Sequence, residues 1–72
     1  MSDSLNVLDV VALTEDLPEE GLRRGQVGTI VEELQSDVYE VEFSDNLGRA
    51  YAMIALRTEQ LLLLRYEMAI AA

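Results

Sequence analysis

The chain has 72 residues, a net charge of −9 at pH 7 and a pI near 4.1. It is long enough for one small domain, and its acidity repels phosphate backbones, which disfavours nucleic acid as a partner. Cysteine and histidine do not occur, which excludes disulfides, thiol chemistry and the side chains that most often act as general base or bind transition metals.

The first residues carry no strong structural signal. Residues 1–6 are mostly small and polar, so we expect a flexible N-terminus. They lack the basic segment and apolar core of a secretory signal, and no apolar run in the chain is long enough to span a bilayer. These features predict a cytoplasmic protein that does not associate with a membrane.

A strand and a long loop follow. Residues 7–13 (VLDVVAL) predict the first strand, because the segment is short and rich in β-branched residues. Residues 14–25 (TEDLPEEGLRRG) predict a loop, in which Pro18 fixes its own φ and Gly21 and Gly25 can take positive φ. Long loops on small barrels often carry recognition surfaces, and this loop holds an acidic cluster and an arginine pair.

The clearest local pattern is a β-hairpin. Residues 26–34 and 38–43 predict its two strands, with residues 35–37 as the turn. In the second strand, apolar residues alternate with two glutamates, the period of two expected when one face is buried. The first strand has apolar residues at both parities, so it is either covered on both faces or shifted by a bulge near Glu32 and Glu33.

The last third of the chain predicts two more strands. Residues 44–48 (SDNLG) are a turn, and residues 49–56 (RAYAMIAL) are a strand whose alanines, tyrosine, methionine and isoleucine suit a tight interior. Residues 57–60 (RTEQ) are compatible with one 3-10 turn, and residues 61–64 are the closing strand. A helix over residues 58–72 is the rival interpretation, because that segment is rich in strong helix formers.

Together these elements predict a mainly β fold: a small five-stranded SH3-like barrel over residues 7–64, with a 3-10 turn before the last strand. An apolar tail, residues 65–72 (RYEMAIAA), follows as strand or helix. Exposing its apolar side chains would be costly, so we expect the tail to dock on its own barrel or on a neighbouring copy.

Three blocks between residues 8 and 64 resemble the small bacterial family catalogued as domain of unknown function 4926: LDVVALTEDLPEEGLRRGQVGTIVEEL, YEVEFSD and GRAYAMIALRTEQLLLL. That family is taken to be SH3-like and has no established activity, so the resemblance implies the fold and transfers no functional residues. Members also resemble partners encoded beside small toxin-like proteins, which would suit an acidic antidote.

A broader likeness is to the KOW-type segment of ribosomal and transcription factors, through Gly25, Gly28, Ile30, Val41 and Phe43. This pattern marks a tight strand entry in many SH3-like barrels of unrelated function. The chain departs from nucleic-acid-binding members by its acidity and its lack of lysine. The barrel of the nitrile hydratase β subunit is similar at the level of the fold alone.

The strongest candidates for a chemical site are Glu32, Glu40 and Glu42, because two or three carboxylates can bind Mg²⁺ or Ca²⁺ or act as acid and base. We interpret them as a solvated face, since the chain has no calcium loop, no histidine and no lysine to tune a carboxylate. The glycines lack the sequence of a phosphate-binding loop, and Met53 and Met68 are interpreted as packing residues. We therefore predict no catalytic, cofactor-binding or metal-binding residue.

Two interaction surfaces are predicted instead. Arg23 and Arg24 can form a recognition patch with Tyr51 or Tyr39 for an acidic partner or a phosphate, although the arginines can also pair locally with Glu19 and Glu20. Half of the residues are apolar, more than so small a domain can bury, which predicts contact with another copy or another protein. The residues assigned to self-association are Leu63, Tyr66, Met68 and Ile70.

These features predict a non-enzymatic interaction module, without a cofactor, that forms a homo-oligomer and docks on a protein partner. One alternative is an antidote that neutralises a small toxic enzyme by covering a basic active-site cleft with its acids. The other is a KOW-like nucleic-acid-binding domain, which the acidity disfavours.

Overall fold

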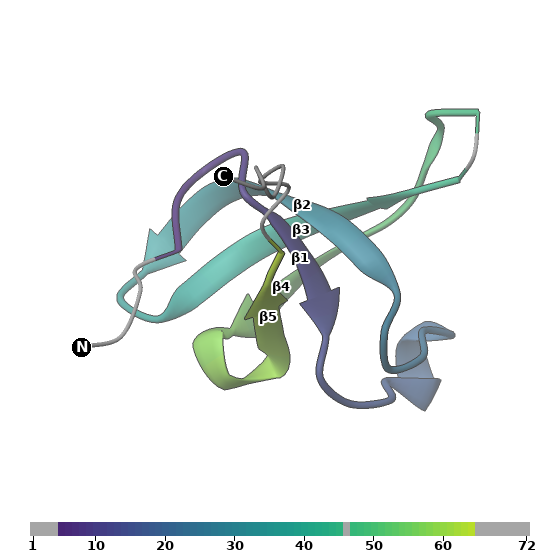
Figure 1. Ribbon diagram of the computed structural model, residues 1–72, viewed down its shortest axis with the longest axis horizontal. Coiled ribbons are helices and arrows are strands. Elements are labelled where there is room, and N and C mark those ends of the chain that lie inside the picture. Colours follow the sequence, from purple (N-terminus) through teal and green to yellow (C-terminus); the bar gives the residue numbers. More distant parts are fainter. Residues whose placement is uncertain (1–4, 46, 65–72) are drawn as a thin grey trace, which may run out of the picture.

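The computed structural model describes residues 5–45 and 47–64, and these form one five-stranded antiparallel sheet (Figure 1). The sheet order is β4-β3-β2-β1-β5, and two 3-10 turns interrupt the described chain. The predicted mainly β fold is confirmed, including the 3-10 turn before the last strand. The elements are β1 (Val10–Leu13), η1 (Pro18–Glu20), β2 (Val27–Gln35), β3 (Val38–Ser44), β4 (Ala50–Arg57), η2 (Thr58–Gln60) and β5 (Leu61–Leu63).

The sheet is strongly curled because its two edge strands are neighbours along the chain. Laid flat, five strands would place β4 and β5 about 19 Å apart, whereas the three residues of η2 rise only about 6 Å. The two edges must therefore approach each other, as Figure 1 shows where β4 and β5 meet at η2. Within the described residues no backbone pairing joins β4 to β5, so the curled sheet stays open along this seam.

The core lies on the inner face of the curl. The alternation predicted for β3 is confirmed, because Tyr39, Val41 and Phe43 are buried while Glu40 and Glu42 are half-buried on the outer face. On β1 and β5 the same parity rule places Val11 and Leu13 inside, opposite Leu63 and Leu61. The core cluster consists of Leu5, Val11, Leu13, Leu22, Ile30, Tyr39, Val41, Phe43, Leu56 and Leu61.

The N-terminal boundary differs from the prediction. β1 begins at Val10, because residues 6–9 form a turn in which Asp9 N–H donates to Asn6 O at 3.0 Å and Asn6 N–H donates to Asp9 Oδ2 at 2.8 Å. Leu8 takes a positive φ of 79° in this turn, which ends the extended run that its β-branched neighbours favour. Leu5 is only 7% exposed and belongs to the core, so the N-terminal segment predicted to be flexible supplies a packed side chain.

Irregular pairing explains the mixed parity of β2. The β2–β3 register shifts between Ile30 and Glu32 and again between Glu33 and Gln35, so the bulge interpretation is right. Each shift moves later side chains to the other face. Leu34 is consequently half exposed although it belongs to the apolar pattern of the strand.

The helix considered for residues 58–72 is wrong for the part that the structure describes, which is the 3-10 turn η2 followed by strand β5. Residues 65–72, with the predicted docking of the tail, lie outside the described residues. On β4, Ala52 and Ile54 pack against the core whereas Tyr51 and Met53 are half exposed. The interior packing predicted for Tyr51 and Met53 is therefore wrong. Among the described residues, no helix has the length and apolar character needed to cross a membrane.

Candidate partner-binding groove

The loop between β1 and β2 folds into a compact unit. Leu17 and Leu22 form an antiparallel bridge, with backbone hydrogen bonds of 2.9 and 3.1 Å in the two directions. The connection between them is η1 followed by Gly21, whose φ of 71° is one that glycine takes without strain. Leu22 is buried in the core and anchors the loop to the sheet. The loop therefore holds its acidic residues in a defined position.

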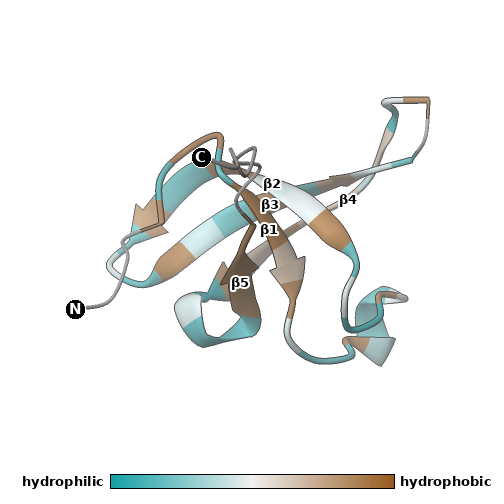
Figure 2. Cartoon of the chain, viewed as in Figure 1, coloured by the Kyte–Doolittle hydropathy of each residue, from teal (hydrophilic) through white to brown (hydrophobic). Residues whose placement is uncertain are grey.

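A groove of about 380 Å³ lies between this loop and the C-terminal half of β4. The loop wall carries four carboxylates, and the strand wall is apolar. In Figure 2 the ribbon around η1, on the loop wall of the groove, is mainly hydrophilic. The groove is lined by Glu15, Asp16, Leu17, Pro18, Glu19, Glu20, Ile54, Ala55, Leu56 and Gln60.

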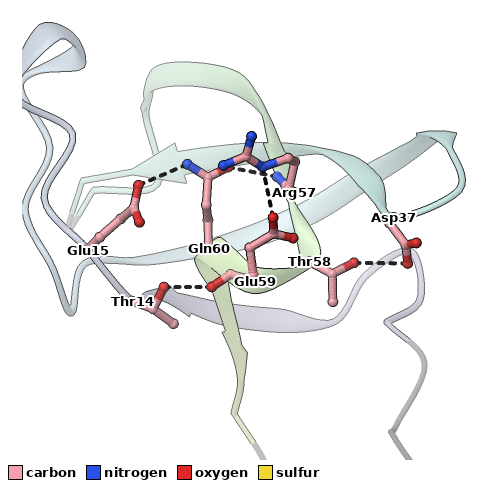
Figure 3. Close-up of polar contacts among 7 residues, drawn as sticks. All are labelled: Thr14, Glu15, Asp37, Arg57, Thr58, Glu59 and Gln60. Atoms are coloured by element: carbon pink, nitrogen blue, oxygen red, sulfur yellow. Dashed lines mark hydrogen bonds and ion pairs between the residues drawn. The ribbon is translucent and has the colours of Figure 1, made fainter.

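Polar contacts of η2 fix one end of the groove (Figure 3). Gln60 Nε2 donates to Glu15 Oε2 at 3.1 Å, and Gln60 Oε1 accepts the backbone N–H of Arg57 at 2.8 Å. The Thr14 hydroxyl donates to the Glu59 carbonyl oxygen at 2.9 Å. The bonds made by Glu15 and Thr14 join residues that are 45 positions apart in sequence, and they hold the loop against the end of β4.

On its other side, η2 is attached to the β2–β3 turn. Thr58 N–H donates to the Asp37 carbonyl oxygen at 3.0 Å, and the Thr58 hydroxyl lies 3.4 Å from Asp37 Oδ1. Asp37 itself takes a positive φ of 65°, which aspartate tolerates better than most residues. The turn η2 thus connects the end of the hairpin to the loop. The relative position of the two groove walls therefore depends on contacts between segments far apart in the sequence.

The groove acids are not neutralised by the arginines of the described residues. The ion pairs within 4.0 Å in that part of the chain join Arg49 to Asp45 and Arg57 to Glu59, both at 3.1 Å and both on the surface. Asp16 Oδ1 accepts the backbone N–H of Arg24 at 2.8 Å, but this bond brings no full positive charge to the carboxylate. The groove therefore presents a concentrated negative potential.

The β3–β4 turn changes the titration of Asp45. The pKa of Asp45 is lowered below its usual 3.8, chiefly because its carboxylate accepts the backbone N–H of Arg49 at 2.9 Å. The backbone N–H of Leu47, at 2.9 Å, and Arg49 Nε, at 3.1 Å, add to the effect. These contacts stabilise the β3–β4 turn, so we assign Asp45 a structural role.

Of the residues predicted as a recognition patch, Arg23 and Tyr51 share a hydrogen-bonding partner, Gln26, whereas the backbone N–H of Arg24 is bonded to Asp16. Gln26 accepts the backbone N–H of Arg23 through Oε1 and donates through Nε2 to the Tyr51 hydroxyl at 3.0 Å. The side chains of Arg23 and Arg24 are exposed, and Arg23 also borders a second hollow, of about 490 Å³, on the loop. Gln26 is the connecting residue that sequence reasoning missed, and its only signal was a polar side chain directly before a strand.

The predicted self-association residues divide into two groups. Leu63 packs against the core, so its side chain is not the exposed one on β5. Tyr66, Met68 and Ile70 lie outside the described residues.

The exposed residue of β5 is Leu62, at 58% exposure. It faces outward beside Ala12 on β1, and Ala12 pairs in turn with Val27 on β2, which is 45% exposed. We call Leu62, Ala12 and Val27 the outer band. These three residues lie on adjacent strands, and the exposed side chains of Leu62 and Val27 form an uncharged surface on either side of Ala12, which is only 7% exposed.

The glutamates that we considered as a chemical site lie on the outer face of the hairpin. Glu32 and Glu40 are direct cross-strand partners, and Glu42 pairs with Thr29. Within residues 5–45 and 47–64, no three acidic side chains are placed to hold a metal ion. Like charges directly opposite each other destabilise a sheet, so this pair contributes unfavourably to the stability of the fold.

Residues 7–63 match the family described as Domain of unknown function (DUF4926). The chain belongs to this family. The resemblance predicted from its sequence blocks is thereby confirmed. No curated protein and no solved structure matches the chain, and the assignment of this DUF4926 domain to SH3-like barrels stays a prediction.

Proposed function

We propose that this DUF4926 domain is a cytoplasmic, non-enzymatic interaction module that self-associates through its outer band and docks a protein partner elsewhere on its surface. The observation that carries the proposal is the outer band, where exposed leucine and valine side chains flank a small, buried alanine across three adjacent strands. The absence of cysteine and histidine from the sequence supports a non-enzymatic role.

The charge distribution favours a second copy as the occupant of the outer band. Each copy carries a net charge of −9, so two copies repel each other wherever acids meet. The outer band contains no charged residue, and contact there removes apolar surface from water without bringing carboxylates together at its centre. A two-fold dimer places Leu62 of each copy in the same interface.

Sedimentation velocity over a dilution series tests this proposal. We expect the wild-type chain to dissociate on dilution and the Leu62→Glu variant to remain monomeric at concentrations where the wild type associates. The matched control is Leu47→Glu, which makes the same substitution at a residue that is 76% exposed in the β3–β4 turn, outside the outer band. A wild-type chain that is monomeric throughout, or equal effects of the two variants, would contradict the proposal.

The antidote role is a second candidate, and the acid-lined loop supports it. Glu15, Asp16, Glu19 and Glu20 are held on one compact unit by the Leu17–Leu22 bridge, and such a surface complements a basic cleft. The test is co-expression with the product of a short neighbouring reading frame. A product that is lethal alone and harmless with this domain supports the role, and the lack of any such neighbour opposes it.

A further inference from the structure

Strand β4 has an edge with no strand partner among the described residues. Seven of its eight residues pair with β3, Tyr51 lies at a register shift, and the sheet order leaves the other side of the strand open. Edge strands of natural proteins are usually short, charged or interrupted by proline, because an open edge is a template for another strand. The opposite edge, β5, has only three residues. In β4 the charged residue is Arg57 at the very end, so most of this edge is long and unprotected.

The unprotected edge lies beside the groove. The strand side of the groove is lined by Ile54, Ala55 and Leu56, and its loop side is lined by Glu15 to Glu20. Leu56 is buried and Ile54 packs against the core, while the small side chain of Ala55 leaves the outer side of this stretch uncrowded. An extended segment lying in the groove would therefore run next to backbone N–H and C=O groups of β4 that have no partner within the described chain.

We propose that the groove binds an extended segment of a partner protein that contains arginine or lysine, and that this segment pairs with β4 as a sixth strand. Backbone hydrogen bonds to β4 supply affinity in this mode of recognition, and alternate side chains supply specificity. One set of side chains faces the acids of the loop. The inference rests on the proposed docking function and names the chemistry of the partner.

The charges decide which kind of segment fits. Four carboxylates line the groove, and no arginine of the described residues forms an ion pair with any of them. The occupant must therefore bring the positive charge. A second copy of β4 would bring only Arg57, which is already paired with Glu59 at 3.1 Å, and would add another net charge of −9. A basic segment of a different protein meets the requirement.

Fluorescence anisotropy with labelled peptides tests the inference on the full chain. The probe is an octapeptide of alternating arginine and valine. In one comparison peptide glutamate replaces each arginine. In the other, every second backbone nitrogen of the probe is methylated. We expect the probe to bind, the glutamate peptide not to bind and the methylated peptide to bind about tenfold more weakly. Hydrogen exchange should slow at amides of β4 when the probe is added.

Paired charge variants separate the groove from general attraction to an acidic protein. Glu19→Gln with Glu20→Gln removes two groove acids, and Glu32→Gln with Glu33→Gln removes the same charge from β2, away from the groove. We expect the first pair to weaken probe binding about tenfold and the second to change it less than twofold.

Equal effects of the two pairs, absence of probe binding or unchanged exchange at β4 would overturn the inference. Each of these outcomes leaves the self-association measured by sedimentation unaffected, so failure here is distinguishable from failure of the proposed function.

Discussion

Gly28 occupies a position on β2 where no side chain fits. A Cβ atom there would lie 2.8 Å from Val41 Cγ1, 2.9 Å from the Glu42 carbonyl oxygen and 2.9 Å from Phe43 Cδ1, closer than the 3.0 Å that real Cβ contacts essentially always exceed. Val41 and Phe43 are fully buried, so neither side chain can move into solvent. The Glu42 oxygen belongs to the backbone of β3 and can move only if the two strands separate.

Gly28→Ala should therefore destabilise the fold. Overpacking a core costs about 1–3 kcal/mol, whereas replacing glycine by alanine within a strand ordinarily gains about 0.5–1 kcal/mol. Because three contacts are too short and one of them is to backbone, we expect a net loss of about 2 kcal/mol in the free energy of unfolding. A domain of 72 residues has a total stability of roughly 4–11 kcal/mol, so this loss is large.

Urea unfolding followed by circular dichroism measures the effect. We expect the midpoint to fall while the slope with urea stays constant, because the change acts on packing and not on the surface exposed by unfolding. In a Val41→Ala background, the Cγ1 atom that makes the shortest contact is absent, so Gly28→Ala should cost less there. A Gly28→Ala variant as stable as the wild type would refute the reasoning.

Two further predictions concern acidic residues. Glu32→Lys places a lysine opposite Glu40 and should stabilise the fold by about 0.2–1 kcal/mol in thermal or urea unfolding. The control, Glu33→Lys, lies opposite Tyr39; it changes the net charge equally and should stabilise the fold less. Equal gains in stability from the two variants would contradict the cross-strand argument. The lowered pKa of Asp45 means that its carboxylate stabilises the fold above the usual pKa of 3.8, and that this contribution is lost as the pH falls through the lowered value. Asp45→Asn should therefore destabilise the domain at neutral pH and lose most of that difference in strong acid, and a pH-independent difference in unfolding free energy would contradict the assignment.

The hairpin could be predicted because its information is local. The alternation of Tyr39, Val41 and Phe43 with glutamates predicts which face of the strand is buried, and the polar residues before Val38 indicate the turn. The family resemblance likewise depends on ordered sequence blocks and was confirmed.

The outward face of β4 could not be predicted, because its run of apolar residues has no alternation to follow. Pairing with β3 decides it: Ala52 lies opposite Phe43 and Ile54 opposite Val41, which turns both toward the core and leaves Met53 outside. The start of β1 was missed for a similar reason. A turn held by hydrogen bonds between Asn6 and Asp9 overrides the β propensity of the residues between them.

The groove was beyond sequence reasoning because it depends on the curl of the whole sheet. Its walls, around Glu15 and Ala55, are 40 positions apart, and they meet only because η2 brings the end of β4 back to the loop. The acids of the loop were visible in the sequence, but their position beside an open strand edge was not. From the arginine pair we predicted that the same loop binds an acidic partner, whereas the groove on this loop is lined by acids.

The two proposed surfaces should respond oppositely to salt, and this follows from the charge that each one carries. At the outer band, two copies with a net charge of −9 approach through an uncharged surface, so screening of their mutual repulsion should strengthen association. At the groove, four carboxylates attract a basic segment, and the same screening should weaken docking. Raising the salt concentration in the sedimentation and anisotropy experiments therefore tests whether two separate surfaces exist. If the self-association constant and the peptide-binding constant changed in the same direction with salt, a single electrostatic surface would account for both kinds of contact.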